Sequence, residues 1–245
     1  MTQQAERSEL LRGIRAGLLE LLAEGVEVLP RPASLPISVA TQRSPEATSA
    51  PGASAAASNA ADELAAIRAD LGDCTRCGLC QDRQHIVFGE GNPNAAVVFV
   101  GEGPGADEDR SGRPFVGKAG QLLDKMIEAV GWKREDVYIC NIVKCRPPKN
   151  RNPEPGEVAM CQPFLERQLR AIGPAAIITL GKPAAMALLK RNVAITRERG
   201  IWQEWEGTPL LPTFHPAYLL RQYTRENRQA VWDDLRAVRE RIEAR

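Results

Sequence analysis

The segment 101–117 holds the residues whose types and spacing are most suggestive of chemistry. It follows an apolar, β-branched run, begins with glycines at 101, 103 and 105, and contains one aromatic side chain, Phe115. It also carries four acids: Glu102, Asp107, Glu108 and Asp109. The glycine spacing matches neither the dinucleotide nor the P-loop pattern, and four carboxylates would repel a phosphate. We therefore expect a neutral, planar ligand held by acids, backbone amides and one aromatic face.

The cysteines form a second group with chemical potential. Cys74 and Cys77 make a C-x2-C pair, and Cys145 and Cys161 make a C-x15-C pair far along the chain. Four thiolates that meet in a reducing compartment bind zinc or an iron–sulfur cluster, and the spacing leaves both open. A different set, in which Cys80 joins Cys74 and Cys77, lacks the x3-Cys-Pro that follows in ferredoxins and is less favoured. The remaining alternative is that all are buried free cysteines.

Basic residues gather locally, although the net charge of the whole chain is only +1. The segment 144–151 contains no acid and four bases: Lys144, Arg146, Lys149 and Arg151. Arg221 and two further arginines follow His215, one of only two histidines. A nucleic-acid interaction would have to come from such local patches, and the alternative is a set of solvated loops.

The elements that must position these residues alternate between strands and helices. The pattern predicts a three-layer α/β/α sandwich around a central, mainly parallel four-stranded sheet. The predicted strands are 96–100, 136–143, 175–180 and 208–214, the last in a hairpin with 200–205. The predicted helices are 61–72, 122–127, 154–172, 184–189 and 224–243, and Pro163 should kink or delay the third. Ligands bind at the carboxyl ends of such strands, where the candidate residues stand.

Composition and patterning set the class and the domain organisation. The chain is 43% hydrophobic and 26% charged, without an apolar run long enough to span a membrane or a signal-peptide pattern. We expect a cytoplasmic monomer with two parts. Residues 1–60 comprise an amphipathic helix at 5–26, which either docks on a protein partner or is a loose appendage, and a Pro/Ala/Ser-rich disordered linker at 30–60. Residues 61–245 form the folded domain.

Six segments, in order over about 74–221, together resemble the iron–sulfur uracil-DNA glycosylases, often called family 4. They are CTRCGL at 74–79, VFGEGNP at 87–93, GEGPG at 101–105, GRPFVG at 112–117, NIVKCRPP at 141–148 and HPA at 215–217. The resemblance implies a uracil-DNA glycosylase fold with a [4Fe–4S] cluster on Cys74, Cys77, Cys145 and Cys161. It implies base excision repair, in which deoxyuridine in single- or double-stranded DNA is hydrolysed to uracil and an abasic site.

The resemblance also implies roles for residues around a flipped uracil. Phe115 would stack on the base, Asn141 would pair with its N3–H and O4, and Glu108 would lie near C5 and exclude thymine's methyl group. His215 would donate to O2 as the base leaves, and Glu102 would position or deprotonate the attacking water. Gly103 would offer a backbone amide and allow close approach.

Local charge predicts DNA contacts for the basic residues and for the loop after His215. The expected phosphate contacts are Lys144, Arg146, Lys149, Arg151 and Arg221. Tyr218 and Leu219 would enter the gap left by the flipped base.

Two other functions remain open. A related branch traps its product covalently, but it carries a histidine-bearing basic loop after the second strand, and residues 144–155 contain no histidine. The chain could instead be a non-enzymatic iron–sulfur DNA-binding module. Each site residue also has a structural alternative: Phe115 in the core, Asn141 and Glu102 as caps, His215 as a structural side chain.

Overall fold

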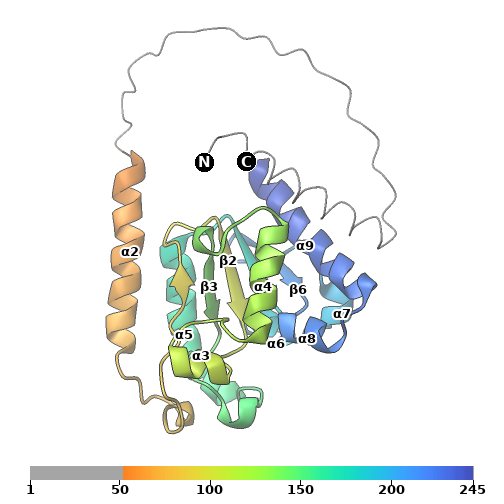
Figure 1. Ribbon diagram of the computed structural model, residues 1–245. Coiled ribbons are helices and arrows are strands. Elements are labelled where there is room, and N and C mark those ends of the chain that lie inside the picture. Colours follow the sequence, from red (N-terminus) through yellow and green to blue (C-terminus); the bar gives the residue numbers. More distant parts are fainter. Residues whose placement is uncertain (1–51, 245) are drawn as a thin grey trace, which may run out of the picture. The chain divides into compact units, whose positions relative to one another are not determined.

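The computed structural model describes the backbone of residues 52–244 and side chains from Ala60 onward (Figure 1). The predicted helix at 5–26 and most of the predicted linker lie outside the described residues. One sheet contains the strands β1 (Glu90–Gly91), β2 (Val97–Gly101), β3 (Tyr138–Asn141), β4 (Ala176–Leu180), β5 (Gln203–Trp205) and β6 (Thr208–Thr213), in the order β1-β3-β2-β4-β6-β5. The four central strands are parallel, and β1 and β5 are antiparallel edges. The α/β class and the mainly parallel sheet are confirmed, with six strands rather than four.

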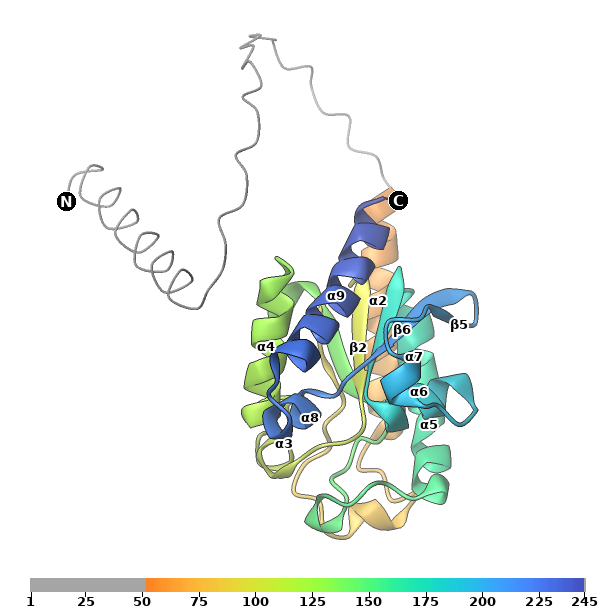
Figure 2. The same cartoon turned by 90° about the vertical axis from the view of Figure 1, so that its right-hand side faces the viewer.

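Helices cover both faces of this sheet. One face packs against α4 (Lys118–Ala129), α8 (Pro216–Arg221) and α9 (Arg225–Glu243), and the other against α2 (Gly52–Leu71), α5 (Pro155–Ile172) and α6 (Lys182–Leu189). Figure 2 shows α4 and α9 on one side of the strands and α5 on the other. Successive side chains of β2 point to opposite faces. Val97 and Phe99 accordingly join the α4 side, and Val98 and Val100 join the α5 side.

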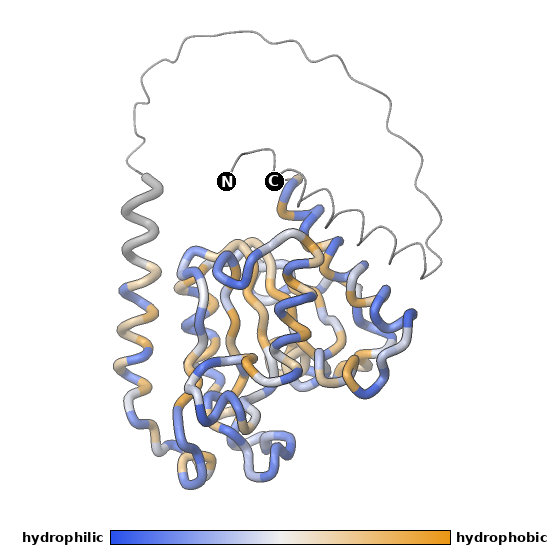
Figure 3. Tube along the Cα trace, viewed as in Figure 1, coloured by the Kyte–Doolittle hydropathy of each residue, from blue (hydrophilic) through white to orange (hydrophobic). Residues whose placement is uncertain are grey.

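The connections contain short elements. They are α3 (Ala106–Ser111), α7 (Ile195–Glu198) and the 3-10 turns η1 (Gly78–Cys80), η2 (Arg134–Asp136) and η3 (Pro148–Asn150). The hydropathy colouring in Figure 3 shows apolar strands inside helices of mixed character, as buried parallel strands require. Within residues 52–244, no helix combines the length and hydropathy needed to cross a bilayer.

Two predicted boundaries differ from the structure. Helix α2 begins at Gly52, inside the predicted linker, because alanine, the strongest helix former, is the commonest residue of its first half. Helix α5 is one continuous helix that contains Pro163, so the late start that we considered is wrong. Its N-terminus is well capped, since the Glu157 carboxylate accepts the backbone N–H of Glu154 at 2.7 Å.

Candidate active site

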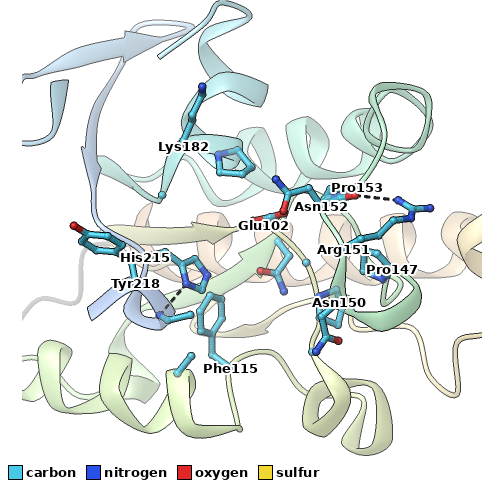
Figure 4. A pocket seen from close by; sticks show the side chains of 18 of the residues that line it. Glu102, Phe115, Pro147, Asn150, Arg151, Asn152, Pro153, Lys182, His215 and Tyr218 are labelled. Atoms are coloured by element: carbon cyan, nitrogen blue, oxygen red, sulfur yellow. Dashed lines mark hydrogen bonds between the residues drawn. The ribbon is translucent and has the colours of Figure 1, made fainter. Parts of the chain in front are cut away.

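A cavity of about 590 Å³ lies at the carboxyl ends of the four parallel strands (Figure 4). Each strand delivers one lining side chain: Glu102 after β2, Asn141 at the end of β3, Lys182 after β4 and His215 after β6. This is the edge at which open α/β sheets bind ligands. Lys182 was not among the predicted site residues, although its place directly after the third predicted strand was a usable signal.

Phe115, Asn141 and His215 all line this cavity, and the first two lie against Gly101. A Cβ atom on Gly101 would lie 2.5 Å from Cζ of Phe115 and 2.4 Å from Oδ1 of Asn141, so only glycine leaves both side chains room. The rings of Phe115 and His215 have centroids 5.7 Å apart and planes inclined by 33°. Figure 4 shows these two rings side by side on the cavity wall. An aromatic face, an amide and an imidazole therefore surround one space.

Asn141 brings an unpaired polar atom to the lining of this space. Its side chain is 1% exposed, and its Oδ1 has no hydrogen-bond partner. Among the side chains that the structure describes, only one other buried polar atom, Oγ1 of Thr179, lacks a partner. Because a buried polar group without a partner is costly, such an atom at a cavity wall indicates a ligand donor.

His215 is held as a neutral hydrogen-bond donor. Its Nδ1 accepts the backbone N–H of Ala217 at 3.0 Å, so in the neutral ring the proton resides on Nε2. Burial, with a smaller contribution from Arg221, lowers the pKa of His215 to about 4. At neutral pH the imidazole therefore offers an uncharged N–H to a ligand.

Glu102 is one of two carboxylates that line the cavity, with Glu108. Burial raises the pKa of Glu102 above its usual value, which makes the group a better proton acceptor. The β2–β3 pairing continues past both strands, since the carbonyl of Glu102 accepts the N–H of Val143 at 3.2 Å. Gly103 must be small, because a Cβ there would lie 2.8 Å from Cγ2 of Val143.

The four predicted ligand cysteines line a second, small cavity. Cys74 and Cys77 follow α2, Cys145 follows β3 and Cys161 lies on α5. Cys80 and Cys140 do not line it. Burial raises the pKa values of Cys145, to about 11, and of Cys161. Buried thiols at raised pKa gain from a bound cation, because it stabilises the thiolate form.

Two guanidinium groups contact the sulfurs of the cysteine site. Arg76 donates to Sγ of Cys74 at 3.3 Å, and Arg83 donates to Sγ of Cys145 at 3.5 Å. Across the part of the chain that is described, no three His, Cys, Asp or Glu residues lie close enough together to hold one metal ion. The four cysteines thus share one cavity, where thiolates could serve as ligands to a metal centre.

Comparisons with known proteins decide the family. Residues 88–236 match the Uracil DNA glycosylase superfamily. The chain is 49% identical over 164 residues to the type-4 uracil-DNA glycosylase of Thermotoga maritima, a match that covers 66% of this chain and 85% of that relative. It is 42% identical over 193 residues to the type-4 enzyme of Saccharolobus solfataricus, covering 75% and 88%. The chain belongs to the type-4 uracil-DNA glycosylases. The type-5 enzyme of Pyrobaculum aerophilum is 36% identical over 146 residues, covering 53% and 64%.

One residue expected to contact DNA in this type-4 glycosylase does not reach solvent. Lys144 is 1% exposed, and its Nζ donates to the carbonyl of Asn141 at 2.9 Å and to Oε1 of Gln168 at 2.5 Å. Burial lowers the pKa of Lys144. The prediction that it contacts a phosphate is wrong, because the ammonium is used to join the end of β3 to α5.

Lys144→Met is expected to lower the free energy of unfolding by about 1–3 kcal/mol, because the carbonyl of Asn141 and Oε1 of Gln168 lose their donor. The salt dependence of DNA binding should stay as in the wild type. Lys149→Ala is the matched control, since Lys149 is exposed on the same loop. This substitution should reduce the slope of log K against log salt by about 0.9, because one phosphate contact is lost. Urea unfolding and DNA titrations at several salt concentrations measure both. A reduced slope in Lys144→Met would show that Lys144 contacts a DNA phosphate after all.

Two further side chains of the type-4 site make contacts that the sequence did not indicate, and the predicted place of Glu108 near uracil C5 stays a prediction. Glu108 lines the cavity, but its carboxylate is already used by the backbone: it accepts N–H groups from Gly105 at 3.0 Å and from Val116 and Gly117 at 2.9 Å. Its main observed task is to tie α3 to the Phe115 loop. Leu219 is 2% exposed in the core, so it cannot enter a base gap, whereas Leu220 is 45% exposed.

The other expected DNA contacts divide into two groups. Arg151, Tyr218 and Arg221 line the cavity, whereas Arg146 and Lys149 lie on the same loop as Arg151 without lining it. The Arg151 guanidinium is paired with both carboxylate oxygens of Glu157 at 2.8 and 2.7 Å. Its charge is therefore partly neutralised within the protein.

Proposed function

We propose that this protein releases uracil from DNA by hydrolysing the N-glycosidic bond of deoxyuridine, as the names of its type-4 relatives state for them. The observation that carries the proposal is the unpaired Oδ1 of Asn141 at a cavity that also holds an aromatic face and a neutral imidazole. Uracil has a flat ring, an N3–H donor and carbonyl acceptors, and these features match the three groups. Cytosine has an acceptor at N3 and a donor at C4, so the Asn141 amide would face it with the wrong polarity.

The mechanism follows from where charge develops. The base is flipped out of the stack and lies on Phe115, and stacking contributes about 1–3 kcal/mol toward the cost of flipping. As the bond to the sugar breaks, negative charge grows on the uracil, and Nε2–H of His215 stabilises it at O2. Glu102 accepts a proton from the attacking water, and its negative charge favours the positively charged sugar.

Glu102→Gln is expected to lower the rate of uracil release by about 10²–10⁴-fold, the range of general base catalysis, with little change in DNA affinity. The raised pKa of Glu102 also sets a direction: in the wild type the rate falls as pH falls through that pKa, since only the carboxylate accepts a proton. Single-turnover release from labelled DNA at several pH values measures both. A Glu102→Gln variant that keeps the wild-type rate would show that Glu102 does not accept the proton of the attacking water.

The cysteine site supports an iron–sulfur cluster as part of the proposal. Four cysteines that line one cavity form the ligand set of a [4Fe–4S] cluster, and the family resemblance of the segments that carry them favours this group over zinc. Cys74, Cys77, Cys145 and Cys161 would hold it, and it would supply a covalent tie between distant parts of the chain. The second set, with Cys80, is not favoured, because Cys80 lies outside the cavity lining.

The proposal extends to surroundings and partners. A cluster on thiolates requires reducing conditions, which supports a cytoplasmic location. The monomeric state and a protein partner for the helix predicted at 5–26 stay predictions.

One assay separates the proposed function from its alternatives. Purified protein is incubated with a duplex that contains one U·G pair, and the products are treated with alkali or with SDS. Strand scission after alkali with release of free uracil supports the glycosylase, and an SDS-stable adduct supports covalent trapping. Binding without either product indicates a DNA-binding module, and a matched duplex with C·G is the negative control.

A further inference from the structure

The backbone at Phe115 is in a conformation that needs outside support. Phe115 has φ of +52°, in the left-handed region that non-glycine residues rarely adopt. Such conformations persist at functional sites only when the surrounding structure holds them. Since Phe115 presents its ring to the cavity, whatever holds this backbone also fixes the ring.

Arg134, the first residue of η2, supplies part of that support from outside the cavity. Its guanidinium donates to the carbonyl of Pro114 at 2.5 Å and to the carbonyl of Phe115 at 3.1 Å. Its other contacts anchor it: Glu90 on β1 accepts from its Nε at 3.1 Å and its Nη2 at 2.7 Å, and Asp124 on α4 accepts at 2.7 Å. One planar group thus connects the Phe115 loop to a sheet edge and a helix.

The opposite side of the same backbone is held as well. The Glu108 carboxylate accepts the N–H groups of Val116 and Gly117, the two residues that follow Phe115. Gly120 permits close packing of α4, because a Cβ there would lie 2.0 Å from the carbonyl oxygen of Phe115. Arg134 thus holds two carbonyl groups at Phe115, and Glu108 holds the two N–H groups that follow it.

We propose that Arg134 is a positioning residue for base recognition, acting through Phe115. The inference rests on the proposed function, in which the Phe115 ring stacks on the flipped base. Arg134 does not line the cavity, so it contributes by fixing the left-handed backbone and hence the plane of the ring. Lysine cannot replace it fully, because a single ammonium cannot span two carbonyls and two carboxylates as the guanidinium fork does.

The test compares Arg134→Met with Arg113→Met. Arg113 pairs with the same Glu90 carboxylate, at 2.8 and 3.1 Å, but it is 62% exposed and lies away from the cavity lining. Arg134→Met should lower kcat/KM for uracil release about tenfold or more, and Arg113→Met should change it by less than about twofold. The loss in Arg134→Lys should lie between these two. Equal effects of Arg134→Met and Arg113→Met would overturn the proposal.

A double-mutant cycle separates positioning from general stabilisation. With Phe115→Ala in the background, Arg134→Met should cause less than about twofold further loss, because the ring on which it acts is gone. Losses that multiply fully would assign Arg134 a role independent of Phe115 and overturn the inference. If Arg134→Met does not fold, the cycle is run with Arg134→Lys.

Hydrogen exchange provides a readout that does not depend on catalysis. The amides of Val116 and Gly117 should exchange faster in Arg134→Met than in Arg113→Met, while amides of β2 stay protected. Unchanged exchange at 116–117 would overturn the proposal that Arg134 holds the Phe115 loop. If the wild type releases no uracil, the proposed function fails, and the exchange result still decides whether Arg134 holds the Phe115 loop.

Discussion

Replacing His215 with alanine is expected to lower the rate of uracil release by about 10²–10³-fold, the cost of removing one donor that faces developing negative charge. The loss should fall on kcat, since the hydrogen bond to O2 strengthens only as the base becomes an anion. The matched control is His85→Ala, because His85 is the other histidine, is exposed and does not line the cavity. A His215 variant with the rate of His85→Ala would contradict the assignment.

The neutral charge state of His215 also predicts how the free energy of unfolding and the rate depend on pH. Its pKa is lowered by burial to about 4, below the ordinary value of 6.5, so the folded protein binds fewer protons than the unfolded chain between these pH values. The free energy of unfolding should therefore rise with pH across this window, and His215→Gln should flatten the rise. Urea unfolding at pH 4.5 and 7 measures it. The rate should also show no fall as pH rises through 6.5, because the donor is the neutral ring.

The shared position of the candidate residues could be predicted, because it follows from sheet topology. Apolar, β-branched runs predict parallel strands, and the polar residues directly after them must then meet at one edge. Asn141, Glu102 and His215 all stand at such positions, and the structure brings them to one cavity. The two-residue strand β1 carries no periodicity that could predict it. Its place in the sheet depends on pairing with β3.

Other contacts could not be predicted from the sequence, because the partners lie on other elements. Lys144 resembles its basic neighbours in sequence, but Gln168 on α5 supplies the acceptor that allows it to be buried. Glu108 is one of four loop acids, and only the folded loop brings the N–H groups of Val116 and Gly117 to its carboxylate. Whether Leu219 or the next residue faces solvent depends on the phase of α8, which six residues do not define in sequence.

The cysteine site and the active-site cavity are connected through one segment of chain. Cys145 and Cys161 bound the segment 145–161, and this segment contributes lining residues to the cavity: Pro147, Asn150, Arg151, Asn152 and Pro153. The segment up to α5 has only the short turn η3 as regular structure. Tying both of its ends to Cys74 and Cys77 would restrict the cavity wall, and we infer a structural role for the proposed cluster on this ground.

Cys161→Ser is therefore expected to produce the second large effect. Loss of one ligand should remove iron and the visible absorption of the cluster, and the midpoint of thermal unfolding should fall, because binding of such a group contributes to folding. Uracil release should fall about 100-fold or more, through misplacement of the cavity wall rather than through any change at His215 or Asn141.

Cys80→Ser is the matched control, because Cys80 stands next to the first pair in sequence but does not line the cysteine cavity. It should keep its iron, its thermal midpoint and its rate. Hydrogen exchange over 146–154 distinguishes the proposed cause: these amides should lose protection in Cys161→Ser, while the core strands β2 and β4 keep theirs. Iron-free protein with wild-type exchange in this segment and a wild-type rate would show that the cavity wall does not need the cluster, and the tie between the two sites would have to be abandoned.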